Sequence, residues 1–217
     1  MVAGHPPEVA DDGRRRAYAY LLGQYLGDGC ISEQRRQVFR MRVTCAMAWP
    51  LIIDLVEASM QILLPTNAVG HLTREGCIEV GMSSKRWPAL FPQHAGGKKH
   101  LRPLALASWQ ETIALDRHPE LFVCGLLHSD GCRSMNKVTV RGKRYAYPRY
   151  FFSNRSEDIH AMFAEALDRL SITSTRSGWN QSVARREDVA VLDGIGASKS
   201  NPCALDVPGA GIEPARS

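Results

Sequence analysis

The sequence predicts an α+β fold built from two pseudo-symmetric repeats, each with the element order αββαββα. Two similar segments carry this prediction, YLLGQYLGDGCIS at residues 20–32 and FVCGLLHSDGCRS at residues 122–134. Their equivalent acids, Asp28 and Asp130, lie 102 residues apart in a chain of 217, which is close to half its length. A similar succession of strand and helix patterns follows each segment.

The first half shows its elements in chain order. Residues 17–28 are expected to form a helix, and residues 38–44 alternate apolar residues with arginine and threonine, the period of a half-buried strand. Residues 50–64 predict an amphipathic helix with proline in its first turn, where the missing N–H costs nothing. A strand at 76–84 and a short helix from Lys85 complete this half.

The second half follows the same order. Residues 137–141 alternate, and residues 147–153 (YPRYFFS) predict the next strand. Ser156 precedes two acids and an apolar pattern, which predicts a capped helix. A strand at 180–186 and a final helix end the repeat. Between the halves, LALASWQETIAL suggests a short connecting helix.

These patterns divide the chain into five parts. We expect a flexible N-terminus, a first repeat, a linker, a second repeat and a disordered tail rich in Pro, Gly and Ser, at residues 1–14, 15–92, 93–119, 120–196 and 197–217.

Composition excludes several classes of protein. Hydrophobic residues make up 44% and charged residues 23%, which excludes a wholly disordered chain. No apolar run approaches the roughly 20 residues of a membrane span, and the N-terminus does not resemble a secretory signal, so we expect a cytoplasmic protein. The net charge of +5 fits a polyanionic partner. The six cysteines form no CxxC pair and are interpreted as reduced thiols.

Small residues recur on one face of each repeated helix. Gly23 and Gly27 are four residues apart, and Gly125 and Ser129 repeat that spacing. Such pairs let two helix backbones approach closely, so we expect the two helices to pack together about an approximate two-fold axis.

This packing would bring Asp28 and Asp130 together at two helix C-termini. Carboxylates add there to the negative end of the helix dipole, and the cluster needs protons or cations. A hard cation such as Mg²⁺ prefers carboxylate and carbonyl oxygens. For a single copy, Asp-Gly is more simply a turn that ends a helix; two copies in the same context favour a metal site that could support phosphodiester hydrolysis.

The nonamers LLGQYLGDG (21–29) and VCGLLHSDG (123–131) resemble the LAGLIDADG motif of homing endonucleases. The resemblance covers roughly residues 15–195 and implies the monomeric two-repeat form. It implies that Asp28 and Asp130 bind catalytic metal, assisted by the carbonyls of Gly27 and Ser129. Where the family name has an acid, this chain has Leu26 and His128.

The resemblance also implies antiparallel sheets that form a saddle over the DNA major groove. Basic strands suit this role, because arginine contacts guanine edges and phosphates; solvated sheet faces are the alternative. The candidate DNA-binding residues are Arg40, Arg42, Thr44, Lys137, Thr139, Arg141, Arg149, Lys85 and Arg186.

Members of the family also place polar side chains around the metal. Lys98 and its neighbour Lys99 are candidates, as is Asn154; we expect Lys98 and Asn154 to be catalytic. For each of them a solvated or structural role is an equal alternative.

The function expected from these observations is a site-specific DNA endonuclease. It would cut both strands of a long, nearly palindromic duplex, with Mg²⁺ or alternatively Mn²⁺ as cofactor, and act as a monomer. The alternatives are a DNA-binding regulator of the same fold that does not cut, an RNA maturase, and a basic scaffold unrelated to nucleic acid.

Overall fold

A computed structural model describes residues 5–205 of the chain. Each half contains three helices and four strands in the predicted order, and a short connecting helix separates the halves. The first half comprises α1 (Asp12–Leu26), β1 (Gly29–Glu33), β2 (Phe39–Ala46), α2 (Pro50–Leu63), β3 (Val69–Arg74), β4 (Cys77–Ser84) and α3 (Trp87–Leu90).

The second half repeats this order after the connecting helix α4 (Ser108–Glu111), which continues as a π-helical turn over Thr112–Arg117. It comprises α5 (Pro119–Asp130), β5 (Gly131–Val140), β6 (Lys143–Ser153), α6 (Glu157–Arg169), β7 (Thr175–Ser177), β8 (Asn180–Val183) and α7 (Arg186–Gly194).

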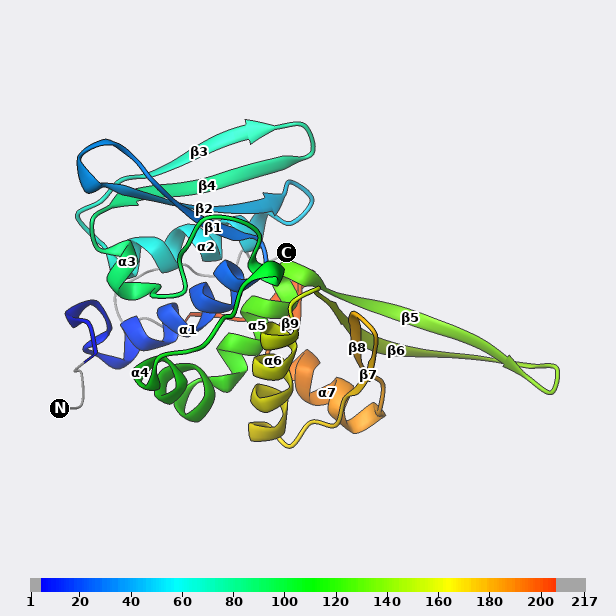
Figure 1. Cartoon of the computed structure of the whole chain (residues 1–217). Coiled ribbons are helices and arrows are strands. Elements are labelled where there is room, and N and C mark those ends of the chain that lie inside the picture. Colours follow the sequence, from blue (N-terminus) through cyan, green and yellow to red (C-terminus); the bar gives the residue numbers. More distant parts are fainter. Residues whose placement is uncertain (1–4, 206–217) are drawn as a thin grey trace.

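Both halves form a four-stranded antiparallel sheet of the same topology. The strand orders are β1-β2-β4-β3 and β5-β6-β8-β7, with every pair antiparallel. The predicted fold class is therefore confirmed. Helices α1 and α5 lie side by side in the centre of the molecule, and β5 and β6 extend far beyond it as a two-stranded ribbon (Figure 1).

The central helices touch through their backbones. A Cβ atom placed on Gly23 would lie 2.6 Å from the carbonyl oxygen of Phe122, and one on Gly125 would overlap the carbonyl of Tyr20. Only glycine permits this approach, because any side chain would force the helices apart. The small residues of the two motifs therefore set how close the halves lie.

The amphipathic helices cover the inner faces of the sheets. On β2, Met41 and Val43 are buried while Thr44 is exposed, as the alternation predicts. Helix α6 begins where the Ser156 hydroxyl accepts a hydrogen bond from the Ile159 amide. Helix α2 begins at Pro50 without a side-chain cap.

Two terminal segments are more ordered than expected. Residues 1–14 were expected to be flexible, yet Pro7–Val9 form a short helix in which Val9 is fully buried. Arg86 also binds the Glu8 carboxylate through two nitrogens. The expectation of flexibility is therefore wrong from Pro7 onward. Residues 197–205 were expected to be disordered, yet β9 (Ala197–Ser198) and β10 (Asn201–Pro202) form a hairpin. Burial of Ala197 and Cys203 explains this order. The remainder of both segments, residues 1–4 and 206–217, lies outside the described part.

Candidate active site and nucleic-acid interface

The two motif acids lie together at the ends of α1 and α5. A Cβ atom on Gly27 would lie 3.1 Å from Oδ2 of Asp130 and would overlap the Ser129 hydroxyl. Asp28 is exposed and Asp130 is half-buried. The helix contact therefore brings both carboxylates, and the carbonyls of Gly27 and Ser129, to one place.

The surroundings of both acids shift their pKa values upward. Partial desolvation, followed by the charge of Asp130, raises the pKa of Asp28 above its usual value. Desolvation also raises the pKa of Asp130, opposed first by a hydrogen bond from Asn154. Both shifts disfavour the charged pair, so a cation bound between the acids would be stabilised.

A lysine lies at each of these helix ends. Lys99 donates to the carbonyls of Tyr25, Gly27 (2.6 Å) and Gly29 (2.9 Å), and burial lowers its pKa to about 8. Lys199 donates to the carbonyl of Ser129 at 2.9 Å, and burial lowers its pKa as well.

The positions of these lysines differ from the sequence prediction in two ways. Lys98 is exposed and lies outside the pocket beside the acids, whereas its neighbour Lys99 lines that pocket. Lys199 was missed because it falls in the segment expected to be disordered. A signal existed in the sequence, since 71 positions separate Asp28 from Lys99 and 69 separate Asp130 from Lys199.

Asn154 contacts Asp130 directly. Its amide nitrogen donates to Oδ2 of Asp130 at 2.6 Å, and its amide oxygen accepts from the Ser156 backbone at 2.8 Å. Both ends of the side chain are thus fixed, which holds the carboxylate in one orientation.

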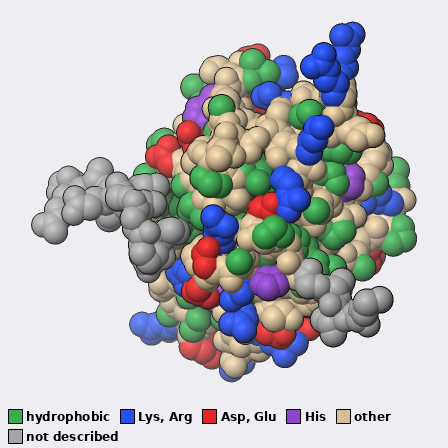
Figure 2. All heavy atoms as spheres, turned by 90° about the vertical axis from the view of Figure 1, so that its left-hand side faces the viewer, with side chains coloured by type: hydrophobic (Ala, Val, Ile, Leu, Met, Phe, Trp, Pro, Cys, Tyr) green, Lys and Arg blue, Asp and Glu red, His purple; other side chains and the backbone are tan. Residues whose placement is uncertain are grey.

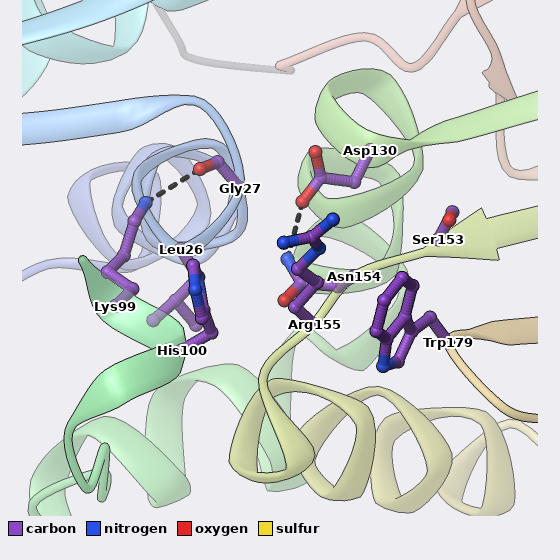
Figure 3. A pocket seen from close by; sticks show the side chains of 9 residues that line it. All are labelled: Leu26, Gly27, Lys99, His100, Asp130, Ser153, Asn154, Arg155 and Trp179. Carbon is purple, nitrogen blue, oxygen red and sulfur yellow. Dashed lines mark hydrogen bonds between the residues drawn. The ribbon is translucent and has the colours of Figure 1, made fainter.

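A pocket of about 480 Å³ opens beside this pair. Figure 3 shows Lys99 and Gly27 on one side of it, with Asp130, Asn154 and Arg155 on the other. The Arg155 guanidinium lies 4.5 Å over the Trp179 ring. Three cationic or amide groups around a carboxylate suit a phosphate group and its metal ion.

His128, two residues before Asp130 in the sequence, belongs to the core. It is 4% exposed, contacts the Tyr20 hydroxyl (3.2 Å) and the Gly196 carbonyl (3.0 Å), and burial lowers its pKa to about 4. His128 is therefore neutral near pH 7 and does not face the pocket.

The outer face of the first sheet carries three of the predicted DNA-binding residues. Arg40, Arg42 and Thr44 alternate on β2 with buried residues. Arg42 also lies 3.8 Å from Glu79, a largely buried acid that Arg74 approaches to 3.9 Å. This cluster mixes donors and an acceptor, a combination that can distinguish base pairs in the major groove.

The ribbon β5–β6 divides its predicted residues between two faces. By register, Lys137 and Thr139 share the face of buried Tyr150, whereas Arg149 lies on the opposite, outer face. The three candidates therefore do not share one surface of the ribbon. Arg141 lies at the ribbon tip, in the left-handed conformation (φ 49°) of a tight hairpin turn.

The remaining two candidates lie at strand ends. Lys85 follows β4 and Arg186 begins α7; both are exposed, and neither lines the pocket. On the face of the molecule opposite the ribbon, acidic and basic side chains are interspersed (Figure 2). The ribbon differs, because residues 131–153 include six Lys and Arg and no acid.

The donor set fits a divalent cation. Among residues 5–205, no group of three or more His, Cys, Asp or Glu residues could hold a metal ion. Mg²⁺, however, is usually bound through one or two carboxylates plus substrate phosphates and water. Asp28 and Asp130 supply the carboxylates, and two lysine ammonium groups already lie on the neighbouring carbonyls, so this place attracts positive charge.

Among the comparisons with known proteins, only the one with solved structures finds similar proteins. No family model matches the sequence, and no curated protein matches it. A solved structure of mesophilic variants of the homing endonuclease I-DmoI is 18% identical with a TM-score of 0.60, covering 89% of this chain and 95% of that one. Other matching I-DmoI structures are complexes with DNA and Mn or Ca.

Two further solved structures are similar. The LAGLIDADG meganuclease I-AabMI bound to uncleaved DNA is 11% identical, with a TM-score of 0.54 over 86% of this chain and 84% of that one. The N-terminal LAGLIDADG domain of DUF199/WhiA is 14% identical, with a TM-score of 0.51 over 87% and 88%. At these identities the likeness concerns the fold.

Proposed function

Because the chain has the two-repeat LAGLIDADG fold of homing endonucleases, we propose that it is a site-specific endodeoxyribonuclease. In this proposal it binds a long DNA target and hydrolyses one phosphodiester bond in each strand, using Mg²⁺ or Mn²⁺. The observation that carries the proposal is the pairing of Asp28 with Asp130, each beside a carbonyl-bound lysine.

The pairing explains why a nuclease is favoured over a binding protein. Two carboxylates repel the DNA backbone unless a cation lies between them. A protein that only binds DNA gains nothing from keeping them, whereas a nuclease needs them to hold its metal.

The chain's own groups would act on the DNA as follows. Asn154 orients the Asp130 carboxylate, because both ends of its amide are hydrogen-bonded. Lys99 and Lys199 supply positive charge beside the acids and can donate to phosphate oxygens and ordered water. The ribbon and the outer face of the first sheet would position the duplex through phosphate and base-edge contacts.

Asp28, Asp130 and the carbonyls of Gly27 and Ser129 would hold the metal ion. When bound, such an ion lowers the pKa of water and stabilises the leaving oxygen. Matching I-DmoI structures contain DNA and Mn or Ca, which supports divalent metal use here.

The test separates binding from cutting. A target is selected from random duplexes in Ca²⁺ and then exposed to Mg²⁺. Asp28→Asn and Asp130→Asn remove charge but little volume, so each variant should bind the target at least as well as the parent protein and cut it at least about 100-fold more slowly. Asp54→Asn, at an exposed site on α2, is the matched control and should cut normally.

Two other functions remain as outcomes of this test. A chain that selects a duplex but never cuts it would be a DNA-binding regulator of the same fold. A chain that selects no duplex but binds structured RNA would be a maturase. Unchanged cutting by either asparagine variant would overturn the metal assignment.

The oligomeric state and the location of the protein follow from the site and from the helices. Both acids belong to one chain, so the site needs no second subunit and we infer a monomer. None of the described helices is long and apolar enough to cross a bilayer. We infer that the protein works in the cytoplasm.

A further inference from the structure

An acid with little exposure lies within the outer face of the first sheet. Glu79 of β4 is opposite the exposed Thr44 of β2 and Leu72 of β3, so its side chain belongs to the face turned away from α2 (Figure 1). The Glu79 side chain is only 11% exposed. Burying a carboxylate costs free energy unless it is compensated, so an acid at this place in a basic protein calls for a reason.

Two arginines approach Glu79 from opposite directions along the sheet. Arg42 lies opposite Gly81, two residues after Glu79 on β4, and Arg74 lies opposite Cys77, two residues before it. Their Nη atoms are 3.8 Å and 3.9 Å from the same carboxylate oxygen. These distances are longer than hydrogen bonds, so Glu79 holds both guanidinium groups by charge.

Arg42 keeps hydrogen-bonding capacity that the protein does not use. Its Nε is buried and has no hydrogen-bond partner within residues 5–205. Its side chain as a whole is 34% exposed, so the guanidinium group reaches the surface of the sheet. Arg42 is therefore oriented toward one place by Glu79 and still able to donate to an acceptor from outside.

The order of donors and acceptor matches a G·C base pair. In the major groove guanine presents two acceptors, N7 and O6, to an arginine, and its paired cytosine presents the N4 amino group to a carboxylate. Arg42 and Glu79 offer the complementary pattern side by side. A phosphate group, in contrast, carries acceptors and negative charge only, so Glu79 repels it.

The second sheet has no acid at the equivalent position. The partners of the two motif cysteines set the correspondence between the sheets, and two residues further along makes Asn180 of β8 equivalent to Glu79 of β4. An amide donates as well as accepts and does not repel phosphate. The acid therefore distinguishes the first sheet from the second.

We propose that Glu79 determines sequence specificity in the first half, because it holds Arg42 for a G·C base pair and prevents Arg42 and Arg74 from serving as general phosphate contacts. This inference rests on the DNA binding in the proposed function. Specificity is a difference between two affinities, so a group that weakens the wrong complex sharpens recognition of the right one. Removing the acid should therefore strengthen binding to DNA in general and weaken discrimination.

The test measures binding in Ca²⁺ and needs no cutting. The parent protein and Glu79→Gln are each used to select a target from random duplexes. Exchanging one G·C pair of the parent's target for A·T should weaken binding by the parent about 10-fold or more, and binding by Glu79→Gln less than about 3-fold. Arg42→Gln should lose the same preference.

A duplex of unrelated sequence gives a second readout of opposite sign. Glu79→Gln should bind it about 3- to 10-fold more tightly than the parent, and the slope of log K against log salt should steepen by about one, because a freed arginine adds a phosphate contact. Damage to the sheet would instead weaken binding to every duplex, so this readout excludes a merely structural role.

The matched control removes the same charge nearby. Glu75 lies in the exposed turn between β3 and β4. Glu75→Gln should strengthen binding to the target and to unrelated DNA by the same small factor and leave the preference for the G·C pair unchanged. The control therefore separates net charge from the position of the acid.

The outcomes separate the two proposals. If the parent protein selects no duplex, both fail. Because the readout is binding, a failure to cut overturns the nuclease and not the role of Glu79. If Glu79→Gln keeps the parent's preference, or binds unrelated DNA no more tightly than Glu75→Gln does, the role of Glu79 is overturned and the nuclease stands.

Discussion

The ribbon β1–β2 pairs over five positions, from Gly29 opposite Val43 to Glu33 opposite Phe39, whereas β5–β6 pairs over ten. The inner strand of the first sheet is supported along its whole length, because β4 pairs with all eight residues of β2. In the second sheet, β8 pairs only with Tyr150–Ser153. At about 3.3 Å per residue, the second ribbon reaches roughly 17 Å further from the acids than the first.

The two halves have nearly the same structure at the contact between α1 and α5. Each presents a helix with small residues at the contact, an acid at its end and a lysine on the preceding carbonyl. The comparison indicates that the contact between the halves fixes the geometry around the two acids. The second ribbon is free to extend further because β8 pairs only with Tyr150–Ser153 of β6. On this basis we expect a DNA footprint longer on the side of the second half.

The largest expected effect concerns the helix contact. Gly125→Ala and Gly23→Ala should each destabilise the protein by about 3 kcal/mol, because the added methyl meets backbone atoms that cannot turn away. Urea unfolding measures the change. Gly194→Ala, at a helical position with no neighbouring atom within 4 Å, is the control and should be stabilising by about 0.4–1 kcal/mol. Equal stability for all three variants would contradict the close backbone contact.

The next effect concerns the ribbon. Deleting residues 136–139 and 144–147 removes four cross-strand pairs, keeps the tip turn and preserves which side chains face outward. DNA affinity should fall about 10- to 100-fold, with a weaker salt dependence, because Lys137 and Arg144 are lost and the tip retracts. Footprinting should lose about four base pairs on one side only.

The control for the ribbon deletion keeps its length. Lys137→Gln with Arg144→Gln should lower affinity without shortening the footprint, which separates charge from reach. The melting temperature of the deletion variant should stay close to that of the parent, since the removed residues are exposed or half-buried. A footprint that shortens on both sides would contradict the assignment of one ribbon to one end of the target.

The smallest expected change in stability concerns the N-termini of the two amphipathic helices, α2 and α6. Ser156→Ala should cost about 1 kcal/mol by removing the cap of α6. Helix α2 has Trp49 at the equivalent position and no side-chain cap, so Trp49→Ser should be about 1 kcal/mol more stable than Trp49→Ala. Thermal unfolding of the three variants measures both differences. If serine gave no advantage over alanine at position 49, Pro50 alone would suffice to start that helix.

Much of the fold could be predicted because its signals are local. Alternation identified β2, proline and serine marked the starts of α2 and α6, and the repeated Gly-x-x-x-small-Asp-Gly pattern located the central helices. Order at the N-terminus and over 197–205 could not be predicted, since Val9 and Cys203 are buried only through contact with distant residues.

Some residues of the candidate site could likewise be predicted from the sequence, and others could not. The sequence by itself determined that two acids end two small-residue helices, and this was enough to place Asp28 beside Asp130. Tertiary structure alone decided that Lys99 rather than Lys98 lies at the acids, and that Lys199 returns from the C-terminal hairpin to join them. It also decided which face of the ribbon carries Arg149. The spacing of small residues along a helix is enough to predict where two helices can pack closely. The direction of a lysine side chain in a loop depends instead on which carbonyl groups, distant in the sequence, lie within its reach.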